Sequence, residues 1–437
     1  MEERYRLLNG QEPIEFRQKI KIVVALLLIA ISILLVRLSY LQVIKGAEFR
    51  QKSDNNSIRY RNIKPLRGLI MDRNGVVLVD NRPSFDVLYI PSKVKGNELS
   101  VEELKRLYKS KSLEFSSDQS IPETAKPYSP IKLEKNVGME KVALVETNAL
   151  NLPGIYIDVS PVRLYLDGEM LAPVIGYTGE ISKEDLEKSN DEYAYGDILG
   201  KHGLEKFFDA YIRGRRGAEL VEVNVYGKEI KNLGRNDPVS GSNLVLTIDA
   251  DLQKAVREAF EGKPGAAVVM DTRDGSVLAM VSSPSFDPNL FNNGISYDQW
   301  DKLQNNPFAP LSNKAISGQY PPGSTYKLIV AAAALEEGII TPDTKILCKG
   351  SFVLGNRTYR CWKKHGHGYV NLHQAIVESC DVYFYTVGKM LGVDKIAEYA
   401  KRFGLGEVAG IDLPNEKRGL VPTKDWKLKR RKSPWSF

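Results

Sequence analysis

The chain has 437 residues, enough for two or three folded domains. Its hydrophobic content of 43% and charged content of 26% are ordinary for a globular protein and exclude a disordered, low-complexity chain. The formal net charge of +7 is modest and spread along the chain, so we expect no nucleic-acid partner. One basic cluster, residues 424–432, fits a solvated surface loop, with an acidic partner or lipid head groups as the alternative.

The first change in composition comes near the N-terminus. Residues 22–44 are almost wholly apolar and are interrupted only by Arg37. A membrane-spanning helix needs about 20 apolar residues, and an arginine near one end can reach the membrane surface. A buried helix of a soluble protein is the alternative. No small-residue cleavage site follows, so the pattern predicts an uncleaved membrane anchor.

The next 200 residues are predicted to be mixed in structure. Residues 64–78 predict two strands joined by an Asn-Gly turn, and residues 200–213 predict an amphipathic helix that ends at a glycine. Helices are also expected around residues 101–107 and 139–148, a strand at 219–225, and a domain boundary in the Gly- and Asn-containing run 231–243.

Beyond residue 243 the pattern becomes sharper. Residues 244–248 predict a strand, followed by a helix over 249–260 that Asp249 caps. Two further strands, 265–270 and 276–281, are separated by a hairpin turn.

Ser324 and Lys327 form a candidate catalytic pair. The prolines and glycine at 321–323 cannot continue a helix, whereas the alanine-rich run after them favours one, so Ser324 is predicted at a helix start. Lys327, three residues on, projects from the same face. A lysine that is held neutral can take the proton of a serine hydroxyl and make it a nucleophile. The alternative is a capped helix that carries a solvated lysine.

Several motifs occur together in the order found in one family. The chain resembles a class B penicillin-binding protein, most closely the penicillin-binding protein 2 group of cell elongation. The motifs that carry this resemblance are residues 67–75, 200–205 with 213–214, the hairpin 265–280, the nucleophile motif 320–327, and Ser379-Cys380-Asp381 in the position of the second motif.

The resemblance implies an α+β fold. It would comprise a cytoplasmic tail (1–21), a single transmembrane helix (22–44), an elongated β-rich pedestal or dimerisation domain (45–243) and a transpeptidase domain (244–437). The last would combine an antiparallel sheet flanked by helices with an all-helical subdomain. The chain would be a single-pass inner-membrane protein, with the residues after Ile44 in the periplasm.

The resemblance also implies a reaction. Ser324 would attack a D-Ala-D-Ala peptidoglycan stem peptide, and the acyl-enzyme would cross-link to a neighbouring stem. Lys327 would take the proton of Ser324, Ser379 would relay a proton to the leaving amine, and Asp381 would hold both in register. No cofactor would be required, and beta-lactams would trap Ser324. Expected partners are the membrane, a polytopic glycan polymerase and scaffold proteins of the elongation machinery.

One motif of the family is missing. Lys-Thr-Gly, the third motif, does not occur in the 437 residues, so we expect an incomplete transpeptidase domain. Two other functions stay open: a scaffold protein that keeps the contacts of the pedestal, which the missing motif favours, and a beta-lactam sensor or beta-lactamase, which share the Ser-x-x-Lys motif.

The sequence also contains a candidate metal site. Cys348, Cys361, His367 and Cys380 lie within 33 positions, and three cysteines with one histidine suit a structural zinc ion. Because Cys380 lies within the second motif, a metal here would brace the catalytic loop. A Cys348–Cys361 disulfide and three unpaired thiols are the alternatives.

Overall fold

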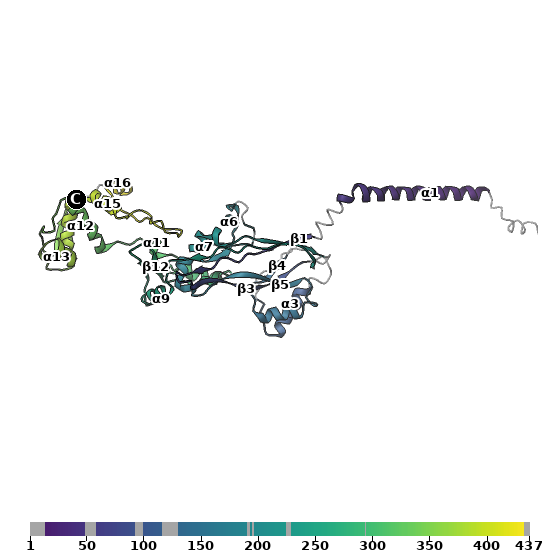
Figure 1. The fold of residues 1–437 in the computed structure, drawn as a ribbon, viewed down its shortest axis with the longest axis horizontal. Coiled ribbons are helices and arrows are strands. Elements are labelled where there is room, and N and C mark those ends of the chain that lie inside the picture. The colour runs from purple at the N-terminus through teal and green to yellow at the C-terminus, as the bar shows by residue number, and fades with distance from the viewer. Residues whose placement is uncertain are drawn as a thin grey trace, which may run out of the picture. The chain divides into compact units, whose positions relative to one another are not determined.

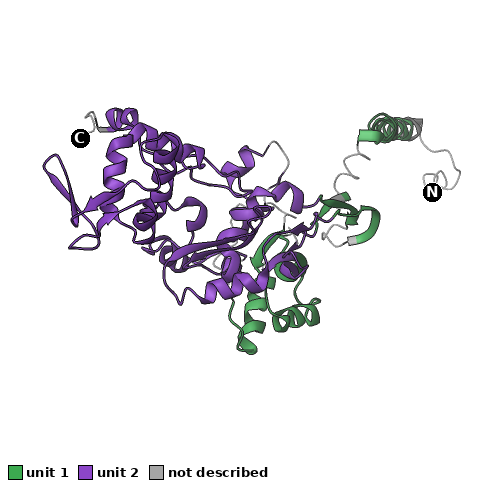
Figure 2. Cartoon of the chain, turned by 60° about the vertical axis from the view of Figure 1, so that its left-hand side comes forward, with its two compact units in different colours: residues 1–65, 83–160, 215–239 green, residues 66–82, 161–214, 240–437 purple. Residues whose placement is uncertain are grey.

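The computed structural model describes residues 14–48, 58–91, 99–115, 130–189, 193–194, 196–223, 229–292 and 294–431 (Figure 1). Most of the predicted tail, residues 1–13, and the last residue of the basic cluster, Lys432, lie outside these ranges. Two compact units are interleaved along the chain: residues 1–65, 83–160 and 215–239 form unit 1, and residues 66–82, 161–214 and 240–437 form unit 2 (Figure 2). The sequence predicted the boundary between the pedestal and the transpeptidase domain between residues 243 and 244.

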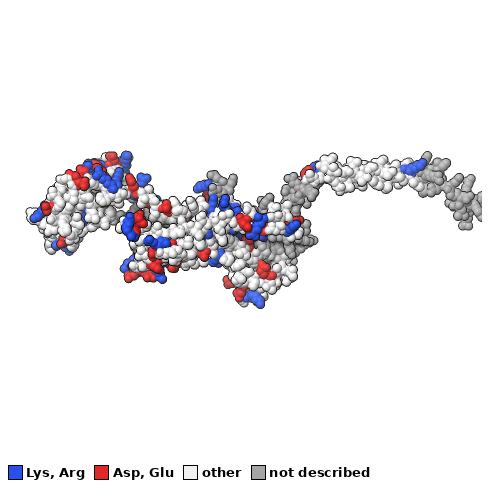
Figure 3. Space-filling model, in the orientation of Figure 1, with Lys and Arg blue, Asp and Glu red and all other residues white. Residues whose placement is uncertain are grey.

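Helix α1 (Ile14–Ser39) continues into a π-helical turn, η1 (Tyr40–Ile44). The stretch Lys19–Ile44 is long and apolar enough to cross a membrane, and none of it is buried in the protein. On the face that Figure 3 shows, charged atoms on this helix lie only toward its ends. The length and apolar composition of this helix therefore agree with the predicted membrane anchor.

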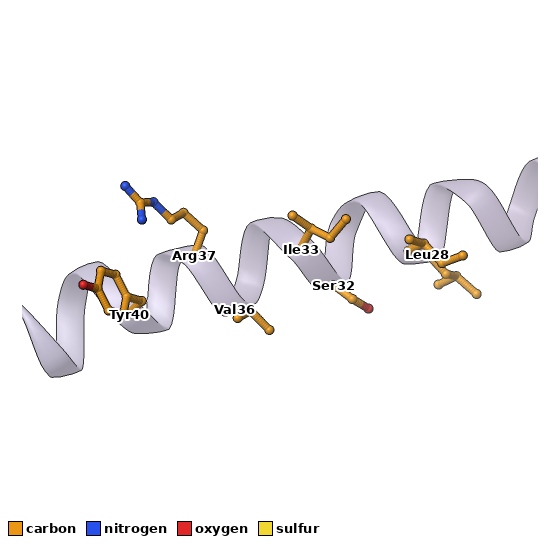
Figure 4. A pocket seen from close by; sticks show the side chains of 7 residues that line it. Leu28, Ser32, Ile33, Val36, Arg37 and Tyr40 are labelled. Carbon is orange, nitrogen blue, oxygen red and sulfur yellow. The ribbon is translucent and has the colours of Figure 1, made fainter.

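One side of α1 is hollowed. The Arg37 guanidinium lies over the Tyr40 ring, 5.4 Å from its centroid, at the end of this hollow (Figure 4). The hollow is lined by Leu28, Ile29, Ser32, Ile33, Val36, Arg37 and Tyr40.

Unit 1 contains an antiparallel sheet of β1 (Ile58–Ile63), β8 (Gly217–Val223) and β9 (Glu229–Asn236), in that order. Strand β9 covers the first part of the run 231–243, in which the sequence predicted a domain boundary. Its residues pair with β8 from Ala218–Asn236 to Val223–Glu229, and register shifts accommodate its irregularities. Backbone pairing with a neighbouring strand has overridden the local turn signals of asparagine and glycine.

The second part of unit 1 packs two helices against strands. Val87, Leu104, Tyr108, Leu133 and Val145 are among the residues of its hydrophobic core. These residues come from the second half of β3 (Val77–Tyr89), α3 (Leu99–Ser110), β4 (Ile131–Glu134) and α4 (Met139–Thr147), with β5 (Ile155–Tyr165) paired to β3. The two predicted helices are thus present.

Unit 2 begins with the predicted hairpin. Strand β2 (Ile70–Met71) pairs antiparallel with the start of β3 and parallel with β10 (Leu244–Val245). This pairing joins residues 66–82 to the segment after residue 243. The helix predicted over 200–213 is instead two short helices, α7 (Gly203–Phe207) and α8 (Asp209–Ile212), because the backbone leaves the helical region at Phe208, where φ is −99° and ψ is 18°.

The remaining elements of unit 2 form a hairpin and a helical lobe. The hairpin strands are β11 (Gly265–Met270) and β12 (Val277–Ser283), as predicted, and α9 (Ala250–Glu258) is capped by Asp249, which accepts a hydrogen bond from the Leu252 N–H. The helical lobe contains α12 (Tyr326–Glu336), α13 (Leu372–Val377), α14 (Asp381–Leu391) and α15 (Val393–Arg402). The other elements are α5 (Gly168–Ile175), β6 (Thr178–Glu180), α6 (Lys183–Glu187), β7 (Ile198–Gly200), η2 (Pro288–Phe291), α10 (Tyr297–Gln304), α11 (Lys314–Ser317), β13 (Ile346–Cys348), β14 (Ser351–Leu354), β15 (Arg357–Arg360), β16 (Gly368–Val370) and α16 (Lys424–Arg431).

Candidate active site

Ser324 lies in a single 3₁₀ turn, η3 (Gly323–Thr325), that leads directly into α12. Gly323 has a φ of +59°, a left-handed conformation that favours glycine and turns the chain into the helix. The inner face of α12 is anchored by Ile329, Val330 and Ala333, which are buried in the core of the helical lobe. The Ser324 side chain stays exposed at the start of this fixed helix.

Lys327 lies one turn further along α12 and contacts the second motif. Its Nζ atom donates hydrogen bonds to Ser379 O at 2.9 Å and Ser379 Oγ at 3.1 Å, and lies 2.6 Å from Asp381 Oδ1. The Lys327 and Asp381 side chains are only 15% and 23% exposed. The hydroxyl of Ser379 in turn donates to Ser324 Oγ at 3.0 Å. Among the described contacts, Lys327 reaches Ser324 through the Ser379 hydroxyl and not directly.

Ser379 occupies a strained position at the end of α13. Its φ is +48°, in the left-handed region where glycine is usual. The Ser379 N–H donates to Ile376 O and the Cys380 N–H to Ala375 O, the two hydrogen bonds of a Schellman C-terminal motif. A glycine would fit this backbone with less strain but would carry no hydroxyl. This backbone conformation directs the Ser379 hydroxyl toward Ser324 and Lys327. It carries a conformational strain energy that neighbouring contacts must offset.

The four predicted metal ligands lie together behind this motif. The thiols of Cys348, Cys361 and Cys380 and a ring nitrogen of His367 all lie within 4.8 Å of one another, and the three cysteines are buried and free. A tetrahedral zinc ion with Zn–S bonds of about 2.3 Å separates two sulfur ligands by about 3.8 Å, so this cluster has the size of a zinc site. His365, two positions away, is exposed and lies outside the cluster.

The four side chains of the cluster differ in their contacts and in their pKa values. His367 Nδ1 lies 3.7 Å from Cys361 Sγ, while its Nε2 lies 3.8 Å from a carboxylate oxygen of Glu378. At 3.8 Å this contact is too long for a hydrogen bond, and His367 Nε2 has no hydrogen-bond partner among the described residues. Burial raises the pKa of the Cys380 thiol to about 12. Burial acts to raise the pKa of Cys348, but hydrogen bonds with His367, Gly350 and Cys380 together outweigh it and lower that pKa to about 7.

Sequence reasoning missed one residue that contacts this site. The backbone N–H of Trp362 donates to Asp381 Oδ2 at 3.1 Å, and its indole Nε1–H donates to Glu378 O at 2.9 Å. These partners lie 19 and 16 positions further along the chain, so no local pattern marks the tryptophan. Its position directly after Cys361 is the only sequence signal that could have drawn attention to it.

Two family models match the chain. The penicillin-binding protein dimerisation domain matches residues 62–246, and the penicillin-binding protein transpeptidase domain matches residues 265–436. Together with the Ser–x–x–Lys and Ser–x–Asp contacts, they define a penicillin-binding protein with a dimerisation and a transpeptidase domain.

Individual relatives specify the branch. The peptidoglycan D,D-transpeptidase MrdA of Acinetobacter baumannii is 37% identical over 428 residues, which are 97% of this chain and 64% of the relative. The structure of penicillin-binding protein PBP2 in complex with MreC from Helicobacter pylori has a TM-score of 0.76 and 34% identity, covering 86% of this chain and 72% of that one.

A second solved structure, on the coordination of polymerization and crosslinking by a peptidoglycan synthase complex, has a TM-score of 0.65 and 31% identity over 95% of this chain and 72% of that one. The chain thus spans about two thirds of the length of the relatives that it matches. It belongs to the penicillin-binding protein 2 (MrdA) family. The resemblance and the α+β fold class inferred from the sequence are thereby confirmed.

Proposed function

We propose that this protein is a peptidoglycan D,D-transpeptidase of cell elongation, with Ser324 as the nucleophile. The observation that carries the proposal is the continuous set of contacts Lys327 Nζ–Ser379 Oγ–Ser324 Oγ, with Asp381 on the lysine. A capped helix with a solvated lysine does not need these contacts. The names of the relatives support the same activity.

The reaction would proceed in two steps. Ser324 Oγ attacks the carbonyl carbon of the penultimate D-alanine, the peptide C–N bond breaks, and the terminal D-alanine leaves as a free amine. With Lys327 neutral, Ser379 would accept the Ser324 proton as its hydroxyl gives its own proton to Lys327, and the reverse transfer through Ser379 would deliver that proton to the leaving amine. An amine of a neighbouring stem peptide then attacks the Ser324 ester, which forms the cross-link and restores the serine. A beta-lactam would stop the reaction at the ester.

Penicillin labelling tests this proposal. The full chain, in detergent, is incubated with a fluorescent penicillin beside a Ser324→Ala control. A stable covalent label that is lost in the control is the expected result. A folded wild-type chain that takes no label would overturn the proposal and favour a scaffold protein. A label that is released quickly would favour a beta-lactamase.

The proposed cell location rests on the apolar helix α1. We infer that α1 anchors the chain in the inner membrane, with the bulk of the chain in the periplasm, where stem peptides occur. The exposed apolar surface of α1 supports contact with lipid or another membrane helix. The H. pylori relative in complex with MreC supports a scaffold partner, and the synthase complex supports a glycan polymerase as partner.

We also propose that Cys348, Cys361, His367 and Cys380 hold a structural zinc ion. The donor set and its spacing fit the ion, and four protein ligands would leave no open position for substrate. Cys380 lies between Ser379 and Asp381 in the chain, so an ion bound to Cys380 would restrain the backbone of the second motif. It would take no part in the acyl transfer.

A further inference from the structure

Trp362 is held at the catalytic loop although it contributes little to the core. Its side chain is 63% exposed, and its ring meets the His367 ring edge-on, with centroids 5.4 Å apart. Exposure of this extent removes most of the hydrophobic gain that usually keeps a tryptophan in place. Its two N–H groups, by contrast, both have partners, and both partners flank Ser379.

The partner of the indole is a carbonyl at a helix end. Glu378 is the C-terminal cap of α13, and the last carbonyls of a helix have no partner within it. The indole N–H of Trp362 satisfies Glu378 O at 2.9 Å. This contact fixes the peptide that enters Ser379, the residue with the left-handed backbone.

The partner of the backbone N–H lies on the other side of Ser379. Trp362 N–H donates to Asp381 Oδ2, while Oδ1 of the same carboxylate receives Lys327. The carboxylate is therefore held between the tryptophan backbone and the lysine. One residue thus contacts the chain immediately before Ser379 and two positions after it.

We propose that Trp362 is a positioning residue that clamps residues 378–381 and holds the Ser379 hydroxyl between Lys327 Nζ and Ser324 Oγ. This role rests on the proposed acyl transfer, which it deepens. Left-handed backbone at a non-glycine residue persists only where surrounding contacts enforce it. The Schellman hydrogen bonds hold Ser379 to the end of α13. The contacts of Trp362 hold residues 378 and 381 to the loop that follows β15.

The test removes the indole N–H and keeps an aromatic ring. Trp362→Phe is compared with wild type and with Trp426→Phe, the same change on α16. A benzothienylalanine at position 362 provides a ring of the same shape without the N–H. Hydrogen exchange is followed at the Ser379 and Cys380 amides, whose Schellman hydrogen bonds protect them in the wild-type chain. Penicillin acylation is resolved into the binding constant and the rate constant of acylation, and metal content is measured.

If the clamp operates, both position-362 variants exchange these two amides faster, while α12 keeps its protection. The acylation rate constant falls about five- to tenfold, as expected for one lost hydrogen bond, and the binding constant and metal content stay unchanged. Trp426→Phe behaves as wild type. The benzothienylalanine variant matches Trp362→Phe because the N–H and not the ring carries the effect.

Several results would overturn the clamp. These are unchanged exchange in Trp362→Phe, faster exchange throughout α12 and α14, loss of the metal, or wild-type behaviour of the benzothienylalanine variant. The exchange measurement does not depend on activity. If Trp362→Phe speeds exchange at the Ser379 and Cys380 amides but penicillin never labels the wild-type chain, the clamp is supported and the acyl transfer is refuted. If penicillin labels the wild-type chain but Trp362→Phe leaves exchange at these amides unchanged, the clamp alone is refuted.

Discussion

The Oγ atom of Ser379 lies 3.0 Å from the Oγ atom of Ser324 and bridges it to the Nζ atom of Lys327, which must be a neutral amine to take a proton. In this arrangement the lysine can accept the Ser324 proton only through the Ser379 hydroxyl. Ser379→Ala is therefore expected to slow acylation by a fluorescent penicillin about 100-fold or more, the size of a general acid–base contribution. The second-order rate constant of labelling measures the effect.

The matched control for this change is Ser110→Ala. Ser110 is exposed in α3, where its hydroxyl donates to Leu107 O and to no other residue that the structure describes, so its loss should leave labelling at the wild-type rate. If Ser379→Ala labels as fast as the control, Lys327 acts on Ser324 directly and the bridging role is wrong.

A buried ion-pair network in unit 2 should dominate the stability of that unit. Glu205 is fully buried and receives Arg163 Nε at 2.6 Å and the Arg67 guanidinium at 2.7 Å, and Arg67 also meets Asp209 at 2.9 Å. Glu205→Gln keeps the shape but leaves two buried arginines with one carboxylate. We expect a loss of about 3–5 kcal/mol in the free energy of unfolding, measured with denaturant.

Glu398→Gln is the control for this effect. Glu398 pairs with Lys395 and Arg402 on α15, where all three side chains are more than 40% exposed. Solvent screens such pairs, so this substitution should change stability much less. Equal effects of the two substitutions would show that burial does not set the strength of the Glu205 network.

Asp72 should make the stability of the protein depend on acid pH. Burial acts to raise the pKa of this carboxyl, but hydrogen bonds from the Val76, Ala250 and Asn74 backbone N–H groups outweigh it and hold the pKa below its ordinary value of 3.8. The folded state thus binds the proton more weakly than the unfolded state. The stability that Asp72 contributes is complete above the unfolded pKa and is lost as pH falls through the lower folded pKa.

Asp72→Asn removes this dependence. The variant should be less stable at neutral pH, because an amide cannot accept from all three N–H groups, and its stability should change less between about pH 5 and pH 2. Denaturant midpoints across this range give the comparison. A variant with the same pH slope as wild type would assign the acid sensitivity to other carboxylates.

Local sequence patterns predicted the elements whose contacts are also local. The hairpin of β11 and β12, the capped start of α9 at Asp249 and the turn before α12 all depend on neighbouring residues. Strand β9 was missed because its pairing with β8 overrides the turn signals of Asn232 and Gly234. The interleaving of the two units was missed because β2 pairs with β10, about 170 positions later.

In the candidate site, too, the sequence predicted what local motifs carry and missed what depends on distant contacts. The motifs supplied Ser324, Lys327, Ser379 and Asp381, and the structure brings all four together. It also shows what the motifs cannot: that Lys327 bonds to Ser379 and not to Ser324, and that Trp362 contacts the loop. Both facts depend on side-chain directions across more than fifteen positions of sequence.

Zinc content and a thiol count together distinguish the three states that the cysteines can adopt. If the cluster holds zinc, the purified chain contains one zinc ion and no disulfide, and a strong chelator lowers its thermal midpoint. Cys361→Ala removes one of four ligands and should lose both the ion and the stability that it provides. His365→Ala is the control, because this histidine is near in sequence but exposed and outside the cluster, and it should keep one zinc ion.

The other two states have different signatures. A Cys348–Cys361 disulfide would leave one titratable thiol and no zinc, and a reductant in place of the chelator would lower the thermal midpoint. Three unpaired thiols would titrate fully in the unfolded chain, with no response to either reagent. Because Cys380 lies between Ser379 and Asp381, loss of zinc should also speed hydrogen exchange at the Ser379 amide. Retained protection there in a zinc-free chain would show that the second motif holds its conformation without the metal.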